Sequence, residues 1–245
     1  RNLTFLYEPT RLNRVKGREW YQQDETAEEY DDWRFSRGGE LVDEGEKEAL
    51  FELVEDIDGS RVLEVACGTG RFAVELAESG ADVTGVDISK PMLMKGVGKA
   101  RERGLGVEFL RGDAKRLPFP DDTFDLVLGM RFFHLVDEPV EYLSEMARVS
   151  KGRVVFDTFN KESARVVYNR FLPMGSRLYS EEDVDEVVEG AGVELVERRD
   201  DFVVPFGLYR VTPKVLAKGI RGIDDAAQSV GGEKLSSVTY WMVEK

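Results

Sequence analysis

The sequence predicts a doubly wound α/β fold: a mostly parallel sheet of seven strands with helices on both faces and an antiparallel last strand. From residue 61 onward, short apolar runs typical of buried strands alternate with segments whose apolar residues recur at helical spacing. Strands separated by helices of this length pair in parallel through right-handed crossovers. The last apolar run follows no helix, so we expect that strand to run antiparallel to its neighbours.

The individual elements are delimited by their apolar spacing and by their end signals. We expect strands at residues 61–66, 81–87, 106–113, 124–130, 151–159, 193–200 and 235–245. We expect helices at residues 43–55, 70–79, 89–104, 137–150 and 180–190. Ser89 is a candidate N-cap with Pro91 in the first turn of its helix, and Ser180 with Asp183 predicts a capping box. Asp137 is the expected N-cap of the fourth helix.

Composition and charge narrow the classes of protein to which the chain can belong. The 245 residues fit one large α/β domain, and 42% hydrophobic residues can bury its core. The formal net charge of −14 argues against nucleic acid or an anionic membrane as the main partner. Cys67 is the single cysteine, which fits a reducing compartment, and no apolar run approaches the ~20 residues of a membrane-spanning helix. We therefore expect a globular cytoplasmic protein with no integral membrane segment.

Three segments lie outside the alternation of strands and helices. Residues 1–40 mix aromatic residues with charge, which predicts an N-terminal helical lid. Residues 160–179 and 201–234 are too long for plain connections, so both are candidate substrate-binding insertions, and we expect the second to be irregular. The apolar run at 202–209 lies within this second segment. It is compatible with a wall of a pocket for the substrate, a lipid-facing surface or plain packing on the sheet edge.

The strongest functional signal is the turn between the first expected strand and its helix. Gly68 and Gly70 in this turn permit positive φ and allow a ligand to approach the backbone closely. Such a turn lies at the carboxyl ends of the strands, where a parallel sheet binds ligands, and it directs helix N–H groups into the same crevice. The span from Gly68 to Ala73 also matches the G-x-G-x-x-A form of a dinucleotide fingerprint, so an NAD(P)-dependent oxidoreductase is one interpretation.

Three carboxylates at or near the ends of successive strands help to separate the interpretations. Asp87 closes the second strand, where it can accept hydrogen bonds from both ribose hydroxyls of a nucleoside cofactor. Asp113 follows the third strand and could accept from an adenine amino group. Glu64, ahead of the glycines, would repel a pyrophosphate but attract a cationic ligand. Together they favour a ligand that joins adenosine to a positive charge.

Residues 61–159 resemble the core of class I S-adenosylmethionine (SAM)-dependent methyltransferases, in the branch that methylates quinones and small molecules. The sequence VLEVACGTGRF is similar to the first motif of the family and VTGVDISKPML to the second. The sequence GDAKRLPFPDDTFDLVLGMRFFHLVDEP resembles the third and fourth motifs. The resemblance implies a Rossmann-like methyltransferase fold, with residues 1–245 as a single domain.

The resemblance also assigns roles to individual residues. Glu64 would lie beneath the methionyl part of SAM, and Asp87 would hold the ribose. The full set of implied cofactor-binding residues is Glu64, Ala66, Gly68, Gly70, Asp87, Ile88, Met92, Asp113, Ala114, Met130 and Arg131. Tyr30, Arg34 and Arg37 resemble the N-terminal segment that covers SAM in related enzymes, and a solvated surface is the competing interpretation of these three residues.

Departures from the family pattern bear on the chemistry. The helix before the fifth strand ends in a shortened turn at residues 148–153, which should not disturb the cofactor. The sequence from Arg131 to His134 stands where amide and amine methyltransferases carry Asn/Asp-Pro-Pro-aromatic, which disfavours those acceptors. His134, the single histidine, is either a general base near the acceptor or a polar residue at the start of a helix. The Asp, Asp-Asn set of metal-dependent catechol methyltransferases is not apparent, so we expect no metal.

The expected activity is transfer of a methyl group from SAM to a small-molecule or lipid-linked acceptor, with release of S-adenosylhomocysteine (SAH). Peripheral contact with lipid is compatible with such an acceptor. Two alternatives stay open: an NAD(P)-dependent oxidoreductase, and a SAM-binding protein without catalytic activity. A quinone-like phenol, a lipid-linked or sugar hydroxyl and a carboxylate are all open as acceptors.

Overall fold

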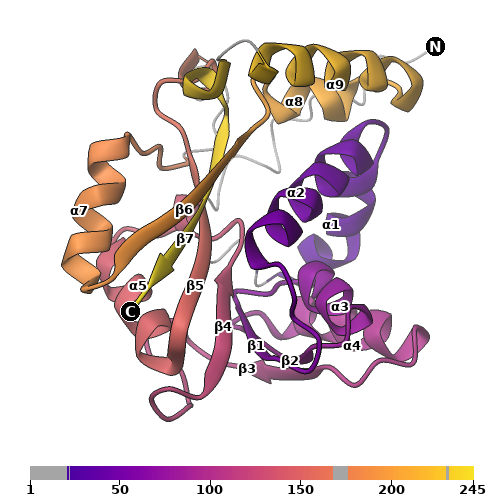
Figure 1. The fold of residues 1–245 in the computed structure, drawn as a ribbon. Coiled ribbons are helices and arrows are strands. Elements are labelled where there is room, and N and C mark those ends of the chain that lie inside the picture. The colour runs from indigo at the N-terminus through magenta and orange to yellow at the C-terminus, as the bar shows by residue number, and fades with distance from the viewer. Residues whose placement is uncertain (1–20, 22, 168–175, 230–231) are drawn as a thin grey trace.

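The computed structural model, drawn in Figure 1, describes residue 21 and residues 23–167, 176–229 and 232–245. Its strands are β1 (Arg61–Val65), β2 (Asp82–Asp87), β3 (Glu108–Arg111), β4 (Phe124–Gly129), β5 (Ser150–Phe159), β6 (Glu194–Asp201) and β7 (Val238–Glu244). Its α-helices are α1 (Asp24–Phe35), α2 (Gly39–Val54), α3 (Arg71–Glu78), α4 (Lys90–Glu102), α5 (Pro139–Val149), α7 (Glu181–Ala191), α8 (Phe206–Val211) and α9 (Lys214–Ser229). Two short 3₁₀ helices are η3 (Phe133–Leu135) and η4 (Gly232–Leu235).

The seven strands form one mixed sheet in the order β3-β2-β1-β4-β5-β7-β6. The pairs from β3 through β5 are parallel, whereas β7 is antiparallel to both β5 and β6. The chain first extends the sheet from β1 outward to β3 and then returns to place β4 on the other side of β1. The predicted doubly wound sheet with an antiparallel last strand is therefore confirmed, and its strand order reverses between β1 and β4.

Each face of the sheet carries its own apolar core. Helices α2, α3 and α4 cover one face, with α8 packed against α2, and α5 and α7 cover the other (Figure 1). In β1, Val62 joins the first core and its neighbour Leu63 joins the second, and both side chains are fully buried. Because successive side chains of a strand point to opposite faces, a strand covered on both sides is apolar along its length. This two-sided burial explains the continuous apolar runs of the sequence.

Two of the three predicted helix N-caps are confirmed and one is wrong. Ser89 accepts a hydrogen bond from the Met92 amide at the start of α4, and Ser180 forms the predicted capping box with Asp183 in α7. The expectation for Asp137 is wrong: α5 begins at Pro139, its N-cap position is occupied by Glu138, and no side chain caps it. Proline fixes the backbone of the first turn and lacks an N–H to satisfy, so this helix starts without a side-chain cap.

The second candidate insertion, expected to be irregular, contains the helices α8 and α9, so that expectation is wrong. Its helical pattern is hidden because a carboxylate lies on the buried face of α9. Asp224 is fully buried there, where it accepts hydrogen bonds from the Tyr209 hydroxyl and from the Val204 amide, the latter at 2.7 Å. Gly219 and Gly222 further weaken the helical signal.

The apolar run at 202–209 mainly packs inside the protein. Phe202, Phe206 and Tyr209 are buried in the core that includes α2, and the rings of Phe206 and Phe159 lie 6.3 Å apart between centroids. Of the three interpretations of this run, packing therefore describes these three aromatic side chains. Leu208 points the other way and is 48% exposed.

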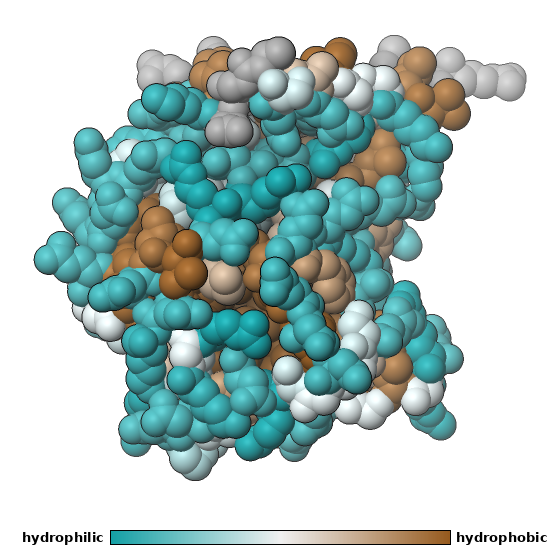
Figure 2. All heavy atoms as spheres, in the orientation of Figure 1, coloured by the Kyte–Doolittle hydropathy of each residue, from teal (hydrophilic) through white to brown (hydrophobic). Residues whose placement is uncertain are grey.

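Hydrophilic residues cover most of the molecular face shown in Figure 2. Several of the large apolar side chains that remain exposed lie on α8 and α9: Leu208, Val211, Val215, Leu216 and Ile223. Among the described residues, none of the helices combines the length and the apolar character that crossing a bilayer requires.

Candidate active site

One pocket opens at the carboxyl ends of the central strands, beside the point where the strand order reverses, and α1 contributes to its wall. This is the place where open parallel sheets bind ligands. The structure brings eleven of the twelve predicted site residues into its lining: Glu64, Ala66, Gly68, Asp87, Ile88, Met92, Asp113, Ala114, Met130, Arg131 and His134. Gly70 is the one that does not line it.

The two glycines of the turn after β1 have different structural roles. Gly68 has a φ of +54°, and a Cβ added there would meet no atom within 4 Å. Gly70 has a φ of +67°, and a Cβ there would lie 2.7 Å from the ring of Phe109. Gly68 therefore leaves open space on the pocket side, whereas Gly70 permits close packing between α3 and the neighbouring strand β3.

Asp87 connects two loops in the lining of the pocket. Its two carboxylate oxygens accept hydrogen bonds from the Gly68 amide at 2.8 Å and from the Ser89 amide at 2.7 Å. The side chain thus fixes the glycine turn after β1 against the start of α4. Each carboxylate oxygen has a second lone pair, so these bonds leave acceptor capacity for a ligand.

Glu64 is a buried carboxyl within β1, with 2% of its surface exposed. Its Oε2 accepts a hydrogen bond from the Ala73 amide at 2.8 Å, which satisfies one free N–H in the first turn of α3. Burial raises the pKa of Glu64 to about 8, and the nearby charge of Asp87 adds to the rise while Arg71 opposes it. A cationic group bound beside Glu64 would favour its ionised form.

Asp113 differs from the other two carboxylates because it is exposed at the rim of the pocket. Its Oδ1 accepts from the Lys115 amide at 3.1 Å, which closes a short turn after β3. Ala114 follows it in the pocket lining, so a carboxylate and a small apolar side chain stand side by side at this edge.

Two residues at the ends of the central strands have a left-handed backbone although they are not glycine. Ala66, after β1, has a φ of +55°, and Arg131, after β4, has a φ of +59°. Both line the pocket. Such backbone conformations cost on the order of 1–3 kcal/mol each and persist where the surroundings fix them. For Arg131 the fixing group is Asp157 in β5, which accepts a hydrogen bond from its backbone amide.

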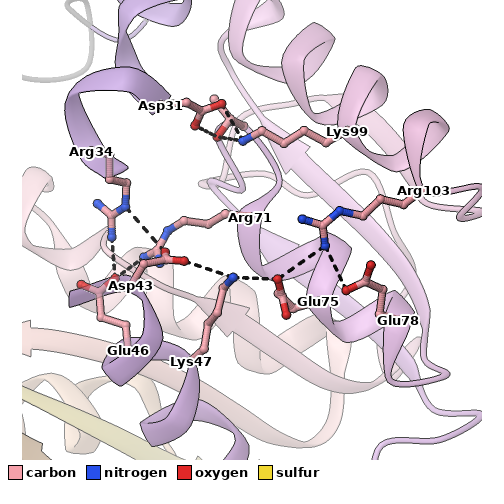
Figure 3. A network of polar contacts seen from close by, with 11 residues as sticks. Asp31, Arg34, Asp43, Glu46, Lys47, Arg71, Glu75, Glu78, Lys99 and Arg103 are labelled. Atoms are coloured by element: carbon pink, nitrogen blue, oxygen red, sulfur yellow. Dashed lines mark hydrogen bonds and ion pairs between the residues drawn. The ribbon is translucent and has the colours of Figure 1, made fainter. Parts of the chain in front are cut away.

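A buried carboxylate in α2, Glu46, links three arginines that come from different parts of the chain (Figure 3 shows two of them). Its oxygens lie 2.5 Å from Arg34, 2.6 Å from Arg71 and 3.2 Å from Arg131. Burial alone would raise the pKa of Glu46, but the charges of the three arginines hold it below its usual range. Glu46 therefore ties together α1, α3 and the turn after β4.

Asp43 and Asp157 complete this buried network. Asp43 pairs with Arg71 and lies 3.1 Å from Lys47 (Figure 3). Asp157, 1% exposed, lies 3.3 Å from a guanidinium nitrogen of Arg131, and burial raises its pKa against the opposing charge of that arginine. The network fixes the arginines that face the pocket in defined positions.

Polar contacts attach helix α1 to the part of the pocket formed by the glycine turn and α4. Asp31 lies 2.7 Å from Lys99 in α4 and accepts a hydrogen bond from the Thr69 hydroxyl at 2.9 Å (Figure 3). Just before α1, the Tyr21 carbonyl accepts from the Ser89 hydroxyl at 2.7 Å. These contacts join α1 to the glycine turn and to the start of α4.

The three residues that resemble a cofactor-covering segment have different positions. Tyr30 and Arg34 line the pocket, and Arg34 is 4% exposed. Arg37 is exposed, does not line the pocket and donates a hydrogen bond to the Val211 carbonyl at 2.7 Å. The solvated-surface interpretation therefore describes Arg37 but neither of the other two.

His134 lies in η3 at the pocket wall, with its ring 4.6 Å from the ring of Phe159 between centroids. Burial, followed by the charges of Arg131 and Arg165, holds the pKa of His134 well below its usual range. The imidazole is therefore neutral near pH 7. Within the described part of the chain, no side chain forms a hydrogen bond that would orient its ring nitrogens.

Sequence reasoning missed several charged residues that line the pocket. Further charged lining residues are Arg71, Arg165 and Arg210, and they come from α3, from the segment after β5 and from α8. Two signals were available for the network beneath them. Glu46 lies four residues before Leu50 of the apolar stripe, on the same side of the helix, and Asp157 interrupts an otherwise apolar strand.

The described residues contain no group of three or more histidine, cysteine, aspartate and glutamate side chains that could hold a metal ion. Cys67 lines the pocket as a buried thiol, and burial raises its pKa well above the usual range. It is therefore a small neutral residue of the turn.

Comparison with known proteins gives consistent results. Residues 62–152 match the family model of a methyltransferase domain. The chain is 36% identical over 160 residues to a demethylmenaquinone methyltransferase of Renibacterium salmoninarum, a match that covers 61% of this chain and 66% of that protein. Matches to curated relatives span from about a third to two thirds of those proteins' own length.

Solved structures share the fold over more of the chain. Magnesium protoporphyrin IX methyltransferase from Synechocystis PCC 6803, solved with bound SAH, is 15% identical with a TM-score of 0.67, covering 93% of this chain and 97% of that one. The structure of the cyclase SpnF is 26% identical with a TM-score of 0.60 and 80% of each chain covered. Together with the ordered motifs, the strand order and the position of the pocket, these matches show that the chain belongs to the class I SAM-dependent methyltransferases, whose cofactor is SAM.

Proposed function

We propose that this protein transfers a methyl group from SAM to a small-molecule or lipid-linked acceptor and releases SAH. The observation that carries the proposal is the position of Glu64, Asp87 and Asp113 around one side of a single pocket, with Ile88 and Met92 beside them. The carboxylates match the cationic methionyl part, the ribose hydroxyls and the adenine amino group of SAM. The apolar side chains match the faces of adenine. A pyrophosphate on this side of the pocket would be repelled by the carboxylates, which disfavours the oxidoreductase alternative.

Methyl transfer is an in-line displacement. A lone pair of the acceptor forms a bond to the methyl carbon while the carbon–sulfur bond breaks, and the electron pair of that bond stays on sulfur. The bound cofactor supplies the methyl group on a positively charged sulfur. The protein contributes position and a dry cavity, which can lower the barrier by roughly 7–11 kcal/mol in ideal cases. Fixed placement of Arg131 by Glu46 and Asp157 is consistent with this positioning role.

The role of His134 as a general base stays a prediction, which one observation favours and another disfavours. Its place in the pocket and its neutral ring allow it to accept a proton. The charges of Arg131 and Arg165 disfavour the imidazolium that would result. A loss of at least a hundredfold in turnover on His134→Asn, with SAM affinity unchanged, would support the base, because general base catalysis contributes roughly 10²–10⁴-fold.

We also propose that α1 is the lid of the site and that both candidate insertions contribute to acceptor binding. The lid is supported by the contacts of Asp31 and Tyr21 with the cofactor side of the pocket. Acceptor binding is supported by Arg165 and Ser176 from the first insertion and by Arg210 from the second, because all three line the pocket. Residues 1–20 and 22 of the expected lid, residues 168–175 of the first insertion and residues 230–231 of the second lie outside the described residues.

Calorimetry with SAM, SAH and NAD tests the cofactor half of the proposal. We expect SAM and SAH to bind and NAD to give no heat of binding; the reverse result would restore the oxidoreductase. Catalysis is tested by incubation with methyl-labelled SAM and an extract of small molecules and lipids. Label in an extracted product supports methyl transfer, whereas SAM binding without transfer favours a non-catalytic protein. The second outcome is a real alternative, since a protein that shares this fold is named a cyclase.

Peripheral contact with lipid is proposed for the outward side of α8 and α9 rather than for the whole run at 202–209. Val215 and Leu216 are 83% and 65% exposed there, next to Leu208. A lipid-linked acceptor is also supported by the relative named as a demethylmenaquinone methyltransferase. We expect co-sedimentation with liposomes that survives high salt, because the net charge of −14 disfavours electrostatic attachment. Loss of binding at high salt would contradict the apolar mode. The cytoplasmic location expected from the single cysteine stays a prediction.

A further inference from the structure

The pocket is rich in guanidinium groups although the protein as a whole is strongly acidic. Five arginines line the pocket: Arg34, Arg71, Arg131, Arg165 and Arg210. The net charge of the chain is −14. Buried cations are costly unless an opposite charge lies beside them. The carboxylates that surround these arginines therefore indicate which of the charges the protein itself balances.

Three of the arginines are balanced by the buried network. Arg34 and Arg71 share Glu46 and Asp43, and Arg131 lies against Glu46 and Asp157. These pairs lie behind the pocket wall, so they explain why the three side chains are held in place.

Arg210 is different. Within the described part of the chain it forms no ion pair, and its Nε is buried without a hydrogen bond. Its guanidinium lies 4.3 Å from the centre of the Trp33 ring, in the lining of the pocket. Burial and the charges of Arg34 and Arg131 lower its pKa to about 10 against the opposing charge of Glu46, which acts without direct contact, and Arg210 stays charged near pH 7. A guanidinium stacked on a ring by its face still presents its N–H edges to a ligand.

Arg165 also lines the pocket. It is 8% exposed, and its guanidinium lies 3.3 Å from the centre of the Phe159 ring and 5.2 Å from that of Phe206. Its charge acts on His134, whose pKa it lowers together with Arg131. Arg165 and Arg210 thus approach the acceptor side from the two candidate insertions, each placed by aromatic rings.

We propose that the acceptor carries a small oxyanion, a carboxylate or a phosphate group, that binds to Arg210 and Arg165. This inference rests on the proposed methyl transfer and names the class of acceptor. Guanidinium groups bind such oxyanions through paired hydrogen bonds, and the bound anion would form the direct ion pair that Arg210 lacks among the described residues. The ring of Trp33, which is 44% exposed, would contact the apolar part of the same molecule. A neutral acceptor would leave Arg210 without a directly paired anion.

The test uses the full chain saturated with SAH and measures binding of matched probes by calorimetry. The probes are straight-chain and phenylalkanoic carboxylic acids with their primary amides, and alkyl phosphates with their alcohols. We expect at least one anion to bind tenfold or more tightly than its neutral match. Carboxylates and phosphates are separate arms, so the result also identifies which oxyanion is preferred. Equal binding of every pair, or no binding by any anion, would overturn the proposal.

Variants assign the effect to the two arginines. Arg210→Gln and Arg165→Gln should each weaken binding of the preferred anion at least tenfold and leave its neutral match within twofold. Arg199→Gln is the control, because Arg199 pairs with Glu52 on the surface. Thermal unfolding checks that each variant is folded, and Arg210→Lys, which keeps the charge, should lose less than Arg210→Gln. Anion preference that survives both glutamine variants would overturn the proposal. Failure of SAH itself to bind would instead count against the proposed function.

Discussion

The two sides of the pocket differ in charge and in how far apart their residues lie in the sequence. The side that we propose binds the cofactor carries Glu64, Asp87 and Asp113, which lie at or near the ends of adjacent strands. The side that we propose binds the acceptor carries arginines from α8 and from the segment after β5, which are far apart in the chain. A ligand that the whole family shares is bound by local motifs, whereas a ligand that varies is bound by residues that only the fold brings together.

The largest expected effect concerns the network behind the acceptor side. Glu46→Ala would leave Arg34, Arg71 and Arg131 without their common buried partner, and breaking a buried ion pair in this way costs about 3–5 kcal/mol. Urea denaturation should show this loss in the free energy of unfolding. Glu52→Ala, which breaks the exposed pair with Arg199, should cost less than about 1 kcal/mol. Similar losses in both variants would contradict the structural role of Glu46.

Next in size is the effect of Asp87 on the cofactor side. Asp87→Ala should weaken SAM binding about tenfold or more, because charge-assisted hydrogen bonds contribute roughly 1.5–3 kcal/mol. The change also frees the amides of Gly68 and Ser89, so part of the loss would come from a looser turn. Asp87→Asn keeps one oxygen and should lose less. Calorimetry of folded Asp87→Ala with unchanged SAM affinity would remove Asp87 from the site.

Glu64 predicts a pH dependence of SAM binding. Its pKa is raised to about 8 in the free protein, and a bound cation favours the ionised form, so binding releases a proton. Affinity should therefore rise with pH, by up to about tenfold per unit, and level off above the raised pKa. Titrations at pH 6, 7 and 8 measure this slope. Glu64→Gln should flatten it, and an equal slope in wild type and variant would show that another group is responsible.

Asp113 has the smallest expected effect because it is exposed. Asp113→Asn can still present one oxygen to the adenine amino group, so SAM affinity should fall only partly, and Asp113→Leu should fall further. Comparison of the two dissociation constants provides the measurement. Binding of NAD with no response at Asp113 would instead favour an oxidoreductase.

Sequence reasoning predicts the sheet well and the site unevenly, for physical reasons. Buried strands such as β1 and β4 have apolar runs that reveal them, and Gly68 with Asp87 forms a motif within twenty residues. The helix α9 was missed because Asp224 and two glycines hide its pattern, although Asp224 is satisfied by partners distant in sequence. Arg210 could not be found for a related reason. An arginine on a short helix is usually solvated, and only the folded chain shows that it faces the pocket.

The division of the pocket is tested most directly by SAM calorimetry on two variants measured side by side. Asp87→Ala alters the cofactor side and Arg210→Gln alters the acceptor side, and both are compared with the wild-type protein. We predict that Asp87→Ala weakens SAM binding about tenfold or more, while Arg210→Gln leaves it within twofold. Equal losses in the two variants, or a loss confined to Arg210→Gln, would contradict the assignment of the two sides.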